Sequence, residues 1–211
     1  MADPSASLSL LEACWRDLVL GVVQGLTEFL PISSTAHLKV VPELLGWGDP
    51  GVSVTAAIQL GSIVAVIAYF RADLSQVLRG ISRAFRNGQW REPEARLGFA
   101  MVVGTLPILL IGSGVKFAWA QGYEQSSLRS VPSIAIVSIV MALLLALAER
   151  VGARCKQLSG VSGRDGLLVG LAQALALIPG VSRSGSTLTA ALFDGWQRAD
   201  AARFSFLLGI P

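Results

Sequence analysis

The chain has 211 residues, of which 53% are apolar and 15% charged, and its formal net charge is +3. This composition excludes an ordinary soluble globular domain and predicts an all-α polytopic membrane protein. The basic residues lie in loops between apolar stretches rather than over one surface. The positive charge therefore indicates membrane topology and argues against nucleic acid as a partner.

The N-terminal segment, MADPSASLSLLEACWRD, has acidic side chains and no basic stretch ahead of its apolar part. It differs from a cleaved secretory signal, and we expect a mature N-terminus on the membrane surface. Residues 17–47 are apolar, but Pro31 and a Ser-Ser-Thr cluster interrupt them. This segment is too short for two crossings of about 20 residues each. We therefore predict a re-entrant hairpin that enters from the outer face and consists of two half-helices separated by a break at Pro31.

Three uninterrupted apolar stretches follow, and each is long enough to cross a bilayer: 52–70, 97–118 and 131–148. Arginines are concentrated in the loops 71–96 and 149–165, which places both loops in the cytoplasm by the positive-inside rule. The intervening loop 121–130 then lies outside. Cys14 and Cys155 are far apart and belong to no metal-binding or redox motif.

A second apolar segment, 166–196, is interrupted at Pro179-Gly180 and is predicted to be a re-entrant hairpin from the inner face. Its part 170–187 shares Gly-x-x-Gln-x-Leu, a proline and a hydroxyl-rich turn with 21–35. This similarity predicts inverted-topology repeats, about 1–120 and about 121–211, whose hairpin tips meet near the bilayer midplane. Only residues 199–211 follow the second hairpin, so we expect a single integral membrane domain, 1–211, truncated at its C-terminus.

Among the ionisable side chains of the two hairpins, Glu28, His37 and Arg183 lie nearest the breaks. Burial of such groups costs free energy unless they pair, contact water or serve a function. Arg183 lies in PGVSRSGST, just after the second break. A helix start, a guanidinium and several hydroxyls in one turn are typical of a phosphate-binding site. The glycines of this turn would let the ligand come close to the backbone. The other interpretation is an ordinary cytoplasmic loop whose arginine reaches the interface.

Gln24 and Glu28 are four residues apart and share one helix face. They predict either a hydrogen-bonded pair between helices or a carboxylate that handles a proton or binds a hard cation, Mg²⁺ or Ca²⁺. His37 is either a structural histidine or a reacting group that shares a wet pocket with Arg183. Gln59 and Gln173 are expected to form packing contacts.

Together these residues supply what phosphoryl transfer needs: cationic groups for the phosphates, a nucleophile or positioned water, and a group that moves protons. QGLTEFLPISSTAH (24–37) and PGVSRSGST (179–187) resemble the main motifs of the bacterial undecaprenyl pyrophosphate phosphatases, also known as bacitracin-resistance proteins. AAIQLGSIVAV, GTLPILLIG and ARFSFLLGIP are similar too, so the resemblance covers nearly the whole chain. Ala36 stands where the family commonly has glycine, and Gln24 is a neutral variant of its acidic motif.

The resemblance implies a metal-dependent hydrolase that removes the terminal phosphate of a C55 polyprenyl diphosphate and so recycles the carrier lipid of cell-wall synthesis. It implies a catalytic set of Glu28, Ser34, His37 and Arg183, in which Ser34, His37 or a water attacks phosphorus. Glu28 and Gln24 would hold Mg²⁺ or Ca²⁺. The substrate-binding residues implied in addition are Ser33, Thr35, Ser182, Ser184, Gly185 and Thr187.

The expected partners are the polyprenyl diphosphate lipid and the bilayer of the bacterial inner membrane, with a homodimer left open. The site is expected to open to the outer, periplasmic face. The rival function is a transporter or flippase for an anionic lipid or small anion, which needs the arginine but no hydrolytic groups. A structural membrane subunit is the third interpretation, and it leaves the ionisable groups at the breaks without explanation.

Overall fold

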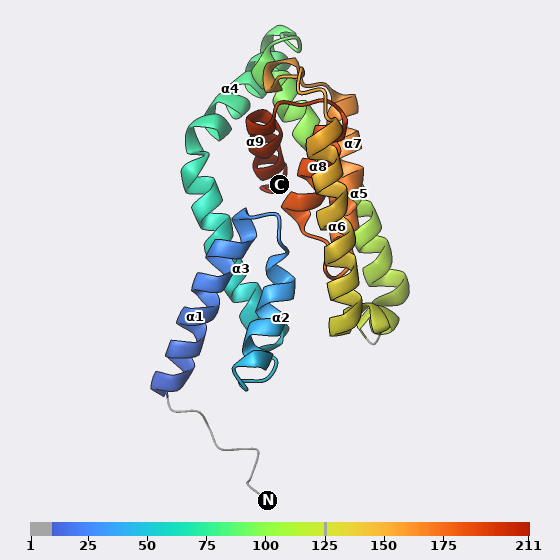
Figure 1. Ribbon diagram of the computed structural model, residues 1–211. Coiled ribbons are helices and arrows are strands. Elements are labelled where there is room, and N and C mark those ends of the chain that lie inside the picture. Colours follow the sequence, from blue (N-terminus) through green and yellow to red (C-terminus); the bar gives the residue numbers. More distant parts are fainter. Residues whose placement is uncertain (1–9, 125) are drawn as a thin grey trace, which may run out of the picture.

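The computed structural model describes residues 10–124 and 126–211, and the regular elements within these residues are all helical (Figure 1). The surface position predicted for the N-terminus falls, for residues 1–9, outside the described part. The α-helices are α1 (Leu10–Phe29), α2 (Ser34–Leu44), α3 (Gly51–Tyr69), α4 (Arg71–Asn87), α5 (Pro93–Glu124), α6 (Val131–Val151), α7 (Gly163–Ala174), α8 (Arg183–Phe193) and α9 (Arg198–Leu208). Three short 3-10 turns accompany them, η1 (Ser127–Arg129), η2 (Leu158–Gly160) and η3 (Leu175–Leu177).

Two of the described helices, α5 and α6, are long and apolar enough to cross a membrane. The helix predicted over 52–70 forms as α3, and it counts as a third span when it is taken together with α4, from which it is bent by 69°. The all-helical prediction and the positions of the long apolar helices are therefore confirmed. Helix α5 continues to Glu124, further than the sequence indicated.

The prediction of a loop over 71–96 is wrong for most of its length, because 71–87 folds as α4. An amphipathic pattern explains the helix: Val77, Gly80 and Ala84 lie on one buried face. Gly80 brings this face against the first turn of α5, where an added Cβ would meet Glu94 Cβ at 2.5 Å. The many arginines mark the exposed face of a helix rather than an irregular loop.

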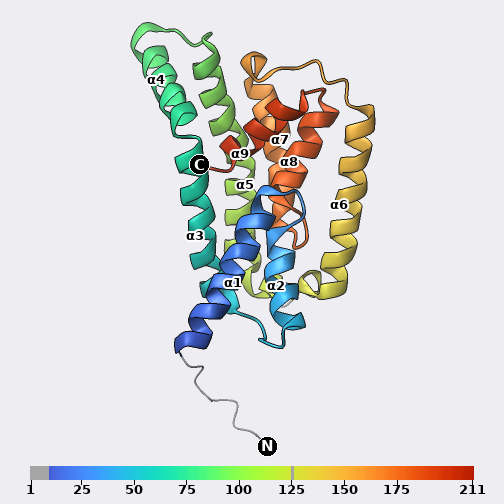
Figure 2. The same ribbon diagram turned by 60° about the vertical axis from the view of Figure 1, so that its left-hand side comes forward.

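Both interrupted segments fold as two helices joined by a short break. In the first, α1 ends at Phe29 and α2 begins at Ser34, and the pair lies side by side in both views (Figures 1 and 2). In the second, α7 and η3 lead into the Pro179-Gly180 turn, where Gly180 has a φ of 96° that favours glycine. Each proline lies where its ring and missing N–H would disrupt a helix interior.

Glycines allow α7 to pack closely against α5. A Cβ on Gly104 would lie 2.7 Å from the Gly166 carbonyl oxygen, and Gly166 and Gly170 leave still less room next to α5. Small residues spaced four apart let helix backbones approach in this way. The contact fixes the second broken segment to a long apolar helix.

The C-terminal residues form a helix that is buried rather than exposed. In α9 the side chains of Ala201, Phe204 and Leu207 are fully buried, and the Phe204 ring stacks on Trp196 with centroids 5.3 Å apart. Figure 1 shows α9 between the α4 side of the molecule and helices α7 and α8. This short helix therefore completes the core around the start of α8.

Ion pairs tie the connections together at the end of the molecule that holds the α4–α5 turn. Lys156 Nζ lies 2.6 Å from Asp194 Oδ2 and 3.2 Å from Asp165 Oδ1. Asp165 also accepts from the Ser162 N–H and forms a capping box at the start of α7. The segment that precedes α7 is thus joined to the turn that follows α8.

Candidate active site

The two helix breaks meet through one ion pair. Glu28 is the last residue but one of α1, and Arg183 is the first residue of α8. Arg183 Nη2 lies 2.9 Å from Glu28 Oε1, and the Glu28 side chain is only 10% exposed. A backbone contact supports the meeting, because Ser184 Oγ lies 3.5 Å from the Leu30 carbonyl oxygen. The sequence assigned these residues to one site, and the structure brings them together.

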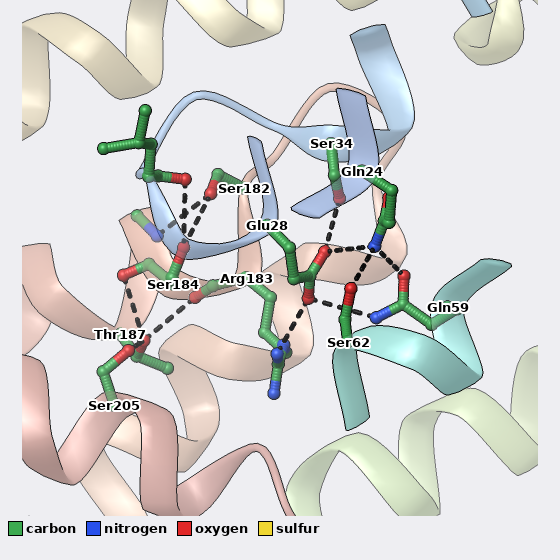
Figure 3. Close-up of polar contacts among 12 residues, drawn as sticks. Gln24, Glu28, Ser34, Gln59, Ser62, Ser182, Arg183, Ser184, Thr187 and Ser205 are labelled. Atoms are coloured by element: carbon green, nitrogen blue, oxygen red, sulfur yellow. Dashed lines mark hydrogen bonds and ion pairs between the residues drawn. The ribbon is translucent and has the colours of Figure 1, made fainter. Parts of the chain in front are cut away.

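Both oxygens of the Glu28 carboxylate accept hydrogen bonds from two donors each (Figure 3). Oε2 accepts from Ser34 Oγ at 2.6 Å and from Gln24 Nε2 at 3.0 Å. Oε1 accepts from Gln59 Nε2 at 3.1 Å in addition to Arg183. Donors around a partly buried carboxylate favour its ionised form and fix its orientation.

Helix α3 contributes polar side chains to the site that sequence reasoning assigned to packing. Besides its bond to Glu28, Gln59 accepts from Gln24 Nε2 through Oε1, and Gln24 Nε2 also lies 3.4 Å from Ser62 Oγ. A glutamine and a serine within an otherwise apolar span were the available signal. Their separation of three residues puts both on the helix face that meets α1.

The turn between α1 and α2 holds a serine in an uncommon backbone conformation. Ser33 has a φ of 66°, is 3% exposed, and its Oγ has no hydrogen-bond partner within the described residues. Ser33 also leaves the first N–H groups of α2 without a side-chain cap. Strained residues and unsatisfied polar groups often mark functional sites. The Ser33 hydroxyl and the start of α2 therefore lack a side-chain partner at a turn that lines the same cavity as Arg183.

The start of α8 is built from hydroxyl groups. Ser182 Oγ accepts from the Gly185 N–H at 3.1 Å and so caps the helix, and it lies 3.2 Å from Ser184 Oγ. Thr187 Oγ1 donates to the Arg183 carbonyl at 2.9 Å and also contacts Ser205 Oγ of α9. Gly185 and Thr187 are buried, so they shape the turn, whereas Ser182, Arg183 and Ser184 line a cavity.

Two cavities adjoin these turns. One, of about 280 Å³, is lined by both breaks and includes Glu28, Ser33, Ser34, Thr35, Ser182, Arg183 and Ser184. The other, of about 410 Å³, shares Ser34 and Gln59 with it and extends to Asp49 and Thr55 near the α2–α3 connection. The smaller cavity therefore holds the candidate reacting groups, and the larger one leads away from them.

His37 lies one turn into α2 and is placed differently from the other sequence candidates. Its Nδ1 is 2.9 Å from the Ser33 carbonyl oxygen, and its side chain lines neither of the two cavities. The imidazole thus contacts the backbone of the strained turn. Gln173, the sequence counterpart of Gln24, is buried within α7 and also lies outside both linings.

The candidate cation ligands are few. Within the described residues no group of three or more His, Cys, Asp or Glu side chains is arranged to hold a metal. Gln24 Oε1, however, is buried without a hydrogen-bond partner, and Nε2 of the same amide donates to Glu28 Oε2. One amide oxygen and one carboxylate fit a hard cation that takes its remaining ligands from phosphate and water, as Mg²⁺ commonly does.

Comparison with known proteins shows that the chain matches a known protein family. The family described as Bacitracin resistance protein BacA matches residues 17–211. Undecaprenyl-diphosphatase from Synechococcus sp. (strain CC9605) is 92% identical over 211 residues, which are 100% of this chain and 74% of the relative. The protein of the same name from Parasynechococcus marenigrum (strain WH8102) is 84% identical over 100% of this chain and 74% of its own. That from Prochlorococcus marinus (strain MIT 9303) is 75% identical over 98% and 70%.

Proposed function

The chain belongs to the bacitracin resistance protein BacA family, and we infer that its two meeting helix breaks form the site of the reaction for which its relatives are named. It is an undecaprenyl-diphosphatase, an integral membrane hydrolase that converts undecaprenyl diphosphate to the monophosphate and inorganic phosphate. The observation that supports this site best is the linked set Ser34, Glu28 and Arg183. It combines a nucleophile, a carboxylate base and a phosphate-binding cation.

Arg183 and the start of α8 would bind the diphosphate. A guanidinium has five N–H donors, and the bond to Glu28 occupies only part of them, so Arg183 can hold its carboxylate partner and a phosphate oxygen together. The hydroxyls of Ser182 and Ser184 and the uncapped N–H groups of α2 add donors on two sides of the small cavity. These donors would neutralise the negative charge on the phosphate oxygens in the transition state.

Ser34 is the proposed nucleophile because its Oγ already donates to Glu28 Oε2 at 2.6 Å. Glu28 would accept the Ser34 proton while Oγ forms a bond to the terminal phosphorus. The bond between this phosphorus and the bridging oxygen breaks, and the polyprenyl monophosphate leaves. A water then hydrolyses the phosphoserine and releases inorganic phosphate. His37 would hold the turn through the Ser33 carbonyl rather than contact the phosphate.

Gln24 and Glu28 are the residues that would hold a Mg²⁺ or Ca²⁺ ion brought in with the diphosphate. Bound there, the ion would supply charge neutralisation at the phosphate oxygens. The proposed role of Gln24 is consistent with its Oε1, which is buried without a hydrogen-bond partner. Burying such an oxygen costs free energy, and a bound ion would offset this cost.

The proposed topology is an inverted repeat of two re-entrant hairpins within one membrane domain, whose second repeat is the shorter within this chain. Arg86, Arg91 and Lys156 lie in the segments near the α4–α5 turn, at the end of the molecule opposite the α2–α3 connection (Figures 1 and 2). The positive-inside rule would put this basic end in the cytoplasm. The 410 Å³ cavity, which reaches Asp49 and Thr55, would then open to the periplasm. A second copy of the chain is not required, because one copy supplies Glu28 and Arg183.

The test is phosphate release from undecaprenyl diphosphate by the purified chain in bilayer nanodiscs, with and without Mg²⁺ or Ca²⁺. We expect release by the unmodified chain and loss of most of it in Arg183→Lys, because an ammonium cannot make the bidentate contact of a guanidinium. Exchange of labelled polyprenyl phosphate across liposomes without phosphate release would instead support the rival transporter. Near-normal turnover of Arg183→Lys would contradict the role given to this residue.

A further inference from the structure

A mostly apolar groove of about 850 Å³ lies between α9 and the bend that joins α3 to α4. Its walls are alanines and aromatic rings, with Val66 and Phe70 buried below them. The two charged residues in its lining, Asp73 and Arg203, are paired with each other. The residues that line it are Phe29, Ala65, Val66, Tyr69, Phe70, Asp73, Ala199, Ala202, Arg203 and Phe206.

This groove shares lining residues with a small cavity next to Glu28 and Arg183. That cavity, of about 20 Å³, is lined by Glu28 and Arg183 and also by Val66 and Phe206. Val66 and Phe206 also line the apolar groove, and Glu28 and Arg183 also line the small polar cavity. The Phe206 ring contacts Phe29, the neighbour of Glu28, with centroids 5.9 Å apart. A chain of shared side chains therefore leads from the phosphate site to the groove.

The two larger cavities near the site differ in chemistry. The 410 Å³ cavity combines apolar side chains with Lys39, Asp49 and Thr55, whose polar groups suit water. The groove at α9 offers mainly hydrocarbon and aromatic surface, which favours an apolar occupant by the hydrophobic effect. A diphosphate that is esterified to a long hydrocarbon needs both kinds of surface at one site.

We propose that the groove between α3 and α9 holds the part of the polyprenyl tail nearest the diphosphate. The proposal rests on the function proposed above and assigns that function its lipid-binding surface. The Asp73–Arg203 pair, which joins α4 to α9, is the charged part of the lining, so the tail would lie along the apolar part and continue into the bilayer. Phe29 and Phe206 stand where the polar head meets the first prenyl units.

The test fills the groove with larger side chains on opposite walls. Ala65 of α3 and Ala199 of α9 are small and exposed, so Ala65→Trp and Ala199→Trp obstruct the groove with little effect on packing. Ala68→Trp is the matched control, because Ala68 is exposed on the same helix and lies outside the groove lining. KM and kcat are measured with undecaprenyl diphosphate, together with the inhibition constant of inorganic pyrophosphate, which has no tail.

We expect KM for undecaprenyl diphosphate to rise about tenfold in both groove variants, because a few methylenes lose their buried surface. The inhibition constant of pyrophosphate should stay within about twofold, as should all values for Ala68→Trp, since the phosphate site is intact. Unchanged KM in both groove variants would overturn the proposal and would indicate that another segment or a second copy covers the groove. A rise in the pyrophosphate constant parallel to KM would overturn it as well.

A second measurement uses the unmodified chain and depends neither on folding of a variant nor on turnover. An undecaprenyl phosphate analogue with a photoreactive group on its first prenyl units is crosslinked in nanodiscs and the adducts are mapped. Adducts at Val66, Phe70 or Phe206 support the groove, and adducts confined to other helices contradict it. Absence of phosphate release with adducts in the groove would refute the hydrolase function alone.

Discussion

Glu28 and Arg183 are 155 positions apart in the sequence, yet Arg183 Nη2 lies 2.9 Å from Glu28 Oε1. Each residue stands at the break of a different interrupted segment, one at the end of α1 and the other at the start of α8. The ion pair therefore holds Glu28, which accepts a hydrogen bond from Ser34, next to the start of α8. A helix start favours the binding of anions. This relationship joins the two helix breaks, which are far apart in the sequence, at the candidate site.

Gln59 is expected to position Glu28, because it donates to Oε1 and accepts from Gln24. Gln59→Leu keeps a similar size but removes both hydrogen bonds. We expect kcat to fall by roughly tenfold to a hundredfold, as for a misplaced catalytic group, with a smaller change in KM. Gln76→Leu on the exposed face of α4 is the control and should keep full activity. Equal activity of the two variants would refute the positioning role.

Ser34→Ala tests the nucleophile. Removal of Oγ should lower kcat roughly a thousandfold or more, because no other hydroxyl donates to the Glu28 carboxylate among the described contacts. Ser53→Ala, an exposed serine of α3, should have no effect. Rapid acid quench of the unmodified chain with substrate labelled at the terminal phosphate should reveal labelled phosphoserine at Ser34. Full turnover of Ser34→Ala would show that Ser34 is not the nucleophile.

Gly104→Ala tests the close contact between α5 and α7. The new Cβ would lie 2.7 Å from the Gly166 carbonyl oxygen, so the helices must separate, at a cost of about 1–3 kcal/mol in the free energy of unfolding. Gly114→Ala is a control on the same helix, where nothing lies within 4 Å of the added atom. It should be neutral or stabilise the helix by about 0.5–1 kcal/mol. A higher Tm for Gly104→Ala than for Gly114→Ala would contradict the packing described.

Lys156 should contribute pH-dependent stability. The Asp194 carboxylate, hydrogen-bonded to Lys156 Nζ, raises the pKa of this amine above its ordinary value of 10.5, although burial opposes the rise. Stability from a raised pKa is complete below the ordinary value and is lost as pH rises through the folded value. Lys156→Met should therefore have a lower Tm at neutral pH, and the difference from the unmodified chain should shrink above about pH 10.5. Lys116→Met serves as the control, and a pH-independent difference would refute the linkage.

Much of the helix pattern could be predicted because the signals are local. Long apolar runs mark the spans, and Pro31 and Pro179-Gly180 mark the breaks. The loop prediction for 71–87 was wrong because it relied on the many arginines and overlooked the helical spacing of Val77 and Ala84, which lie on the opposite helix face. The burial of α9 depends on contacts of Phe204 and Leu207 with distant helices, which no local pattern records.

In the candidate site, too, local sequence signals were predictable and contacts between distant helices were not. The motifs made Glu28, Ser34 and Arg183 candidates, because charged and hydroxyl side chains are unusual at breaks in apolar sequence. Gln59 was assigned to packing, since its bond to Glu28 depends on how α3 meets α1 in space. The positive φ of Ser33 was likewise beyond prediction, because serine shows no preference for this conformation.

The most direct test of the joint site is a kinetic cycle on Glu28→Gln, Arg183→Lys and the double variant, with kcat/KM for phosphate release from undecaprenyl diphosphate. Residues that act as one unit lose their effect together, so the double variant should be about as slow as the slower single variant. Losses that multiply in the double variant would show that Glu28 and Arg183 act independently, and the account of one site at the two breaks would be wrong.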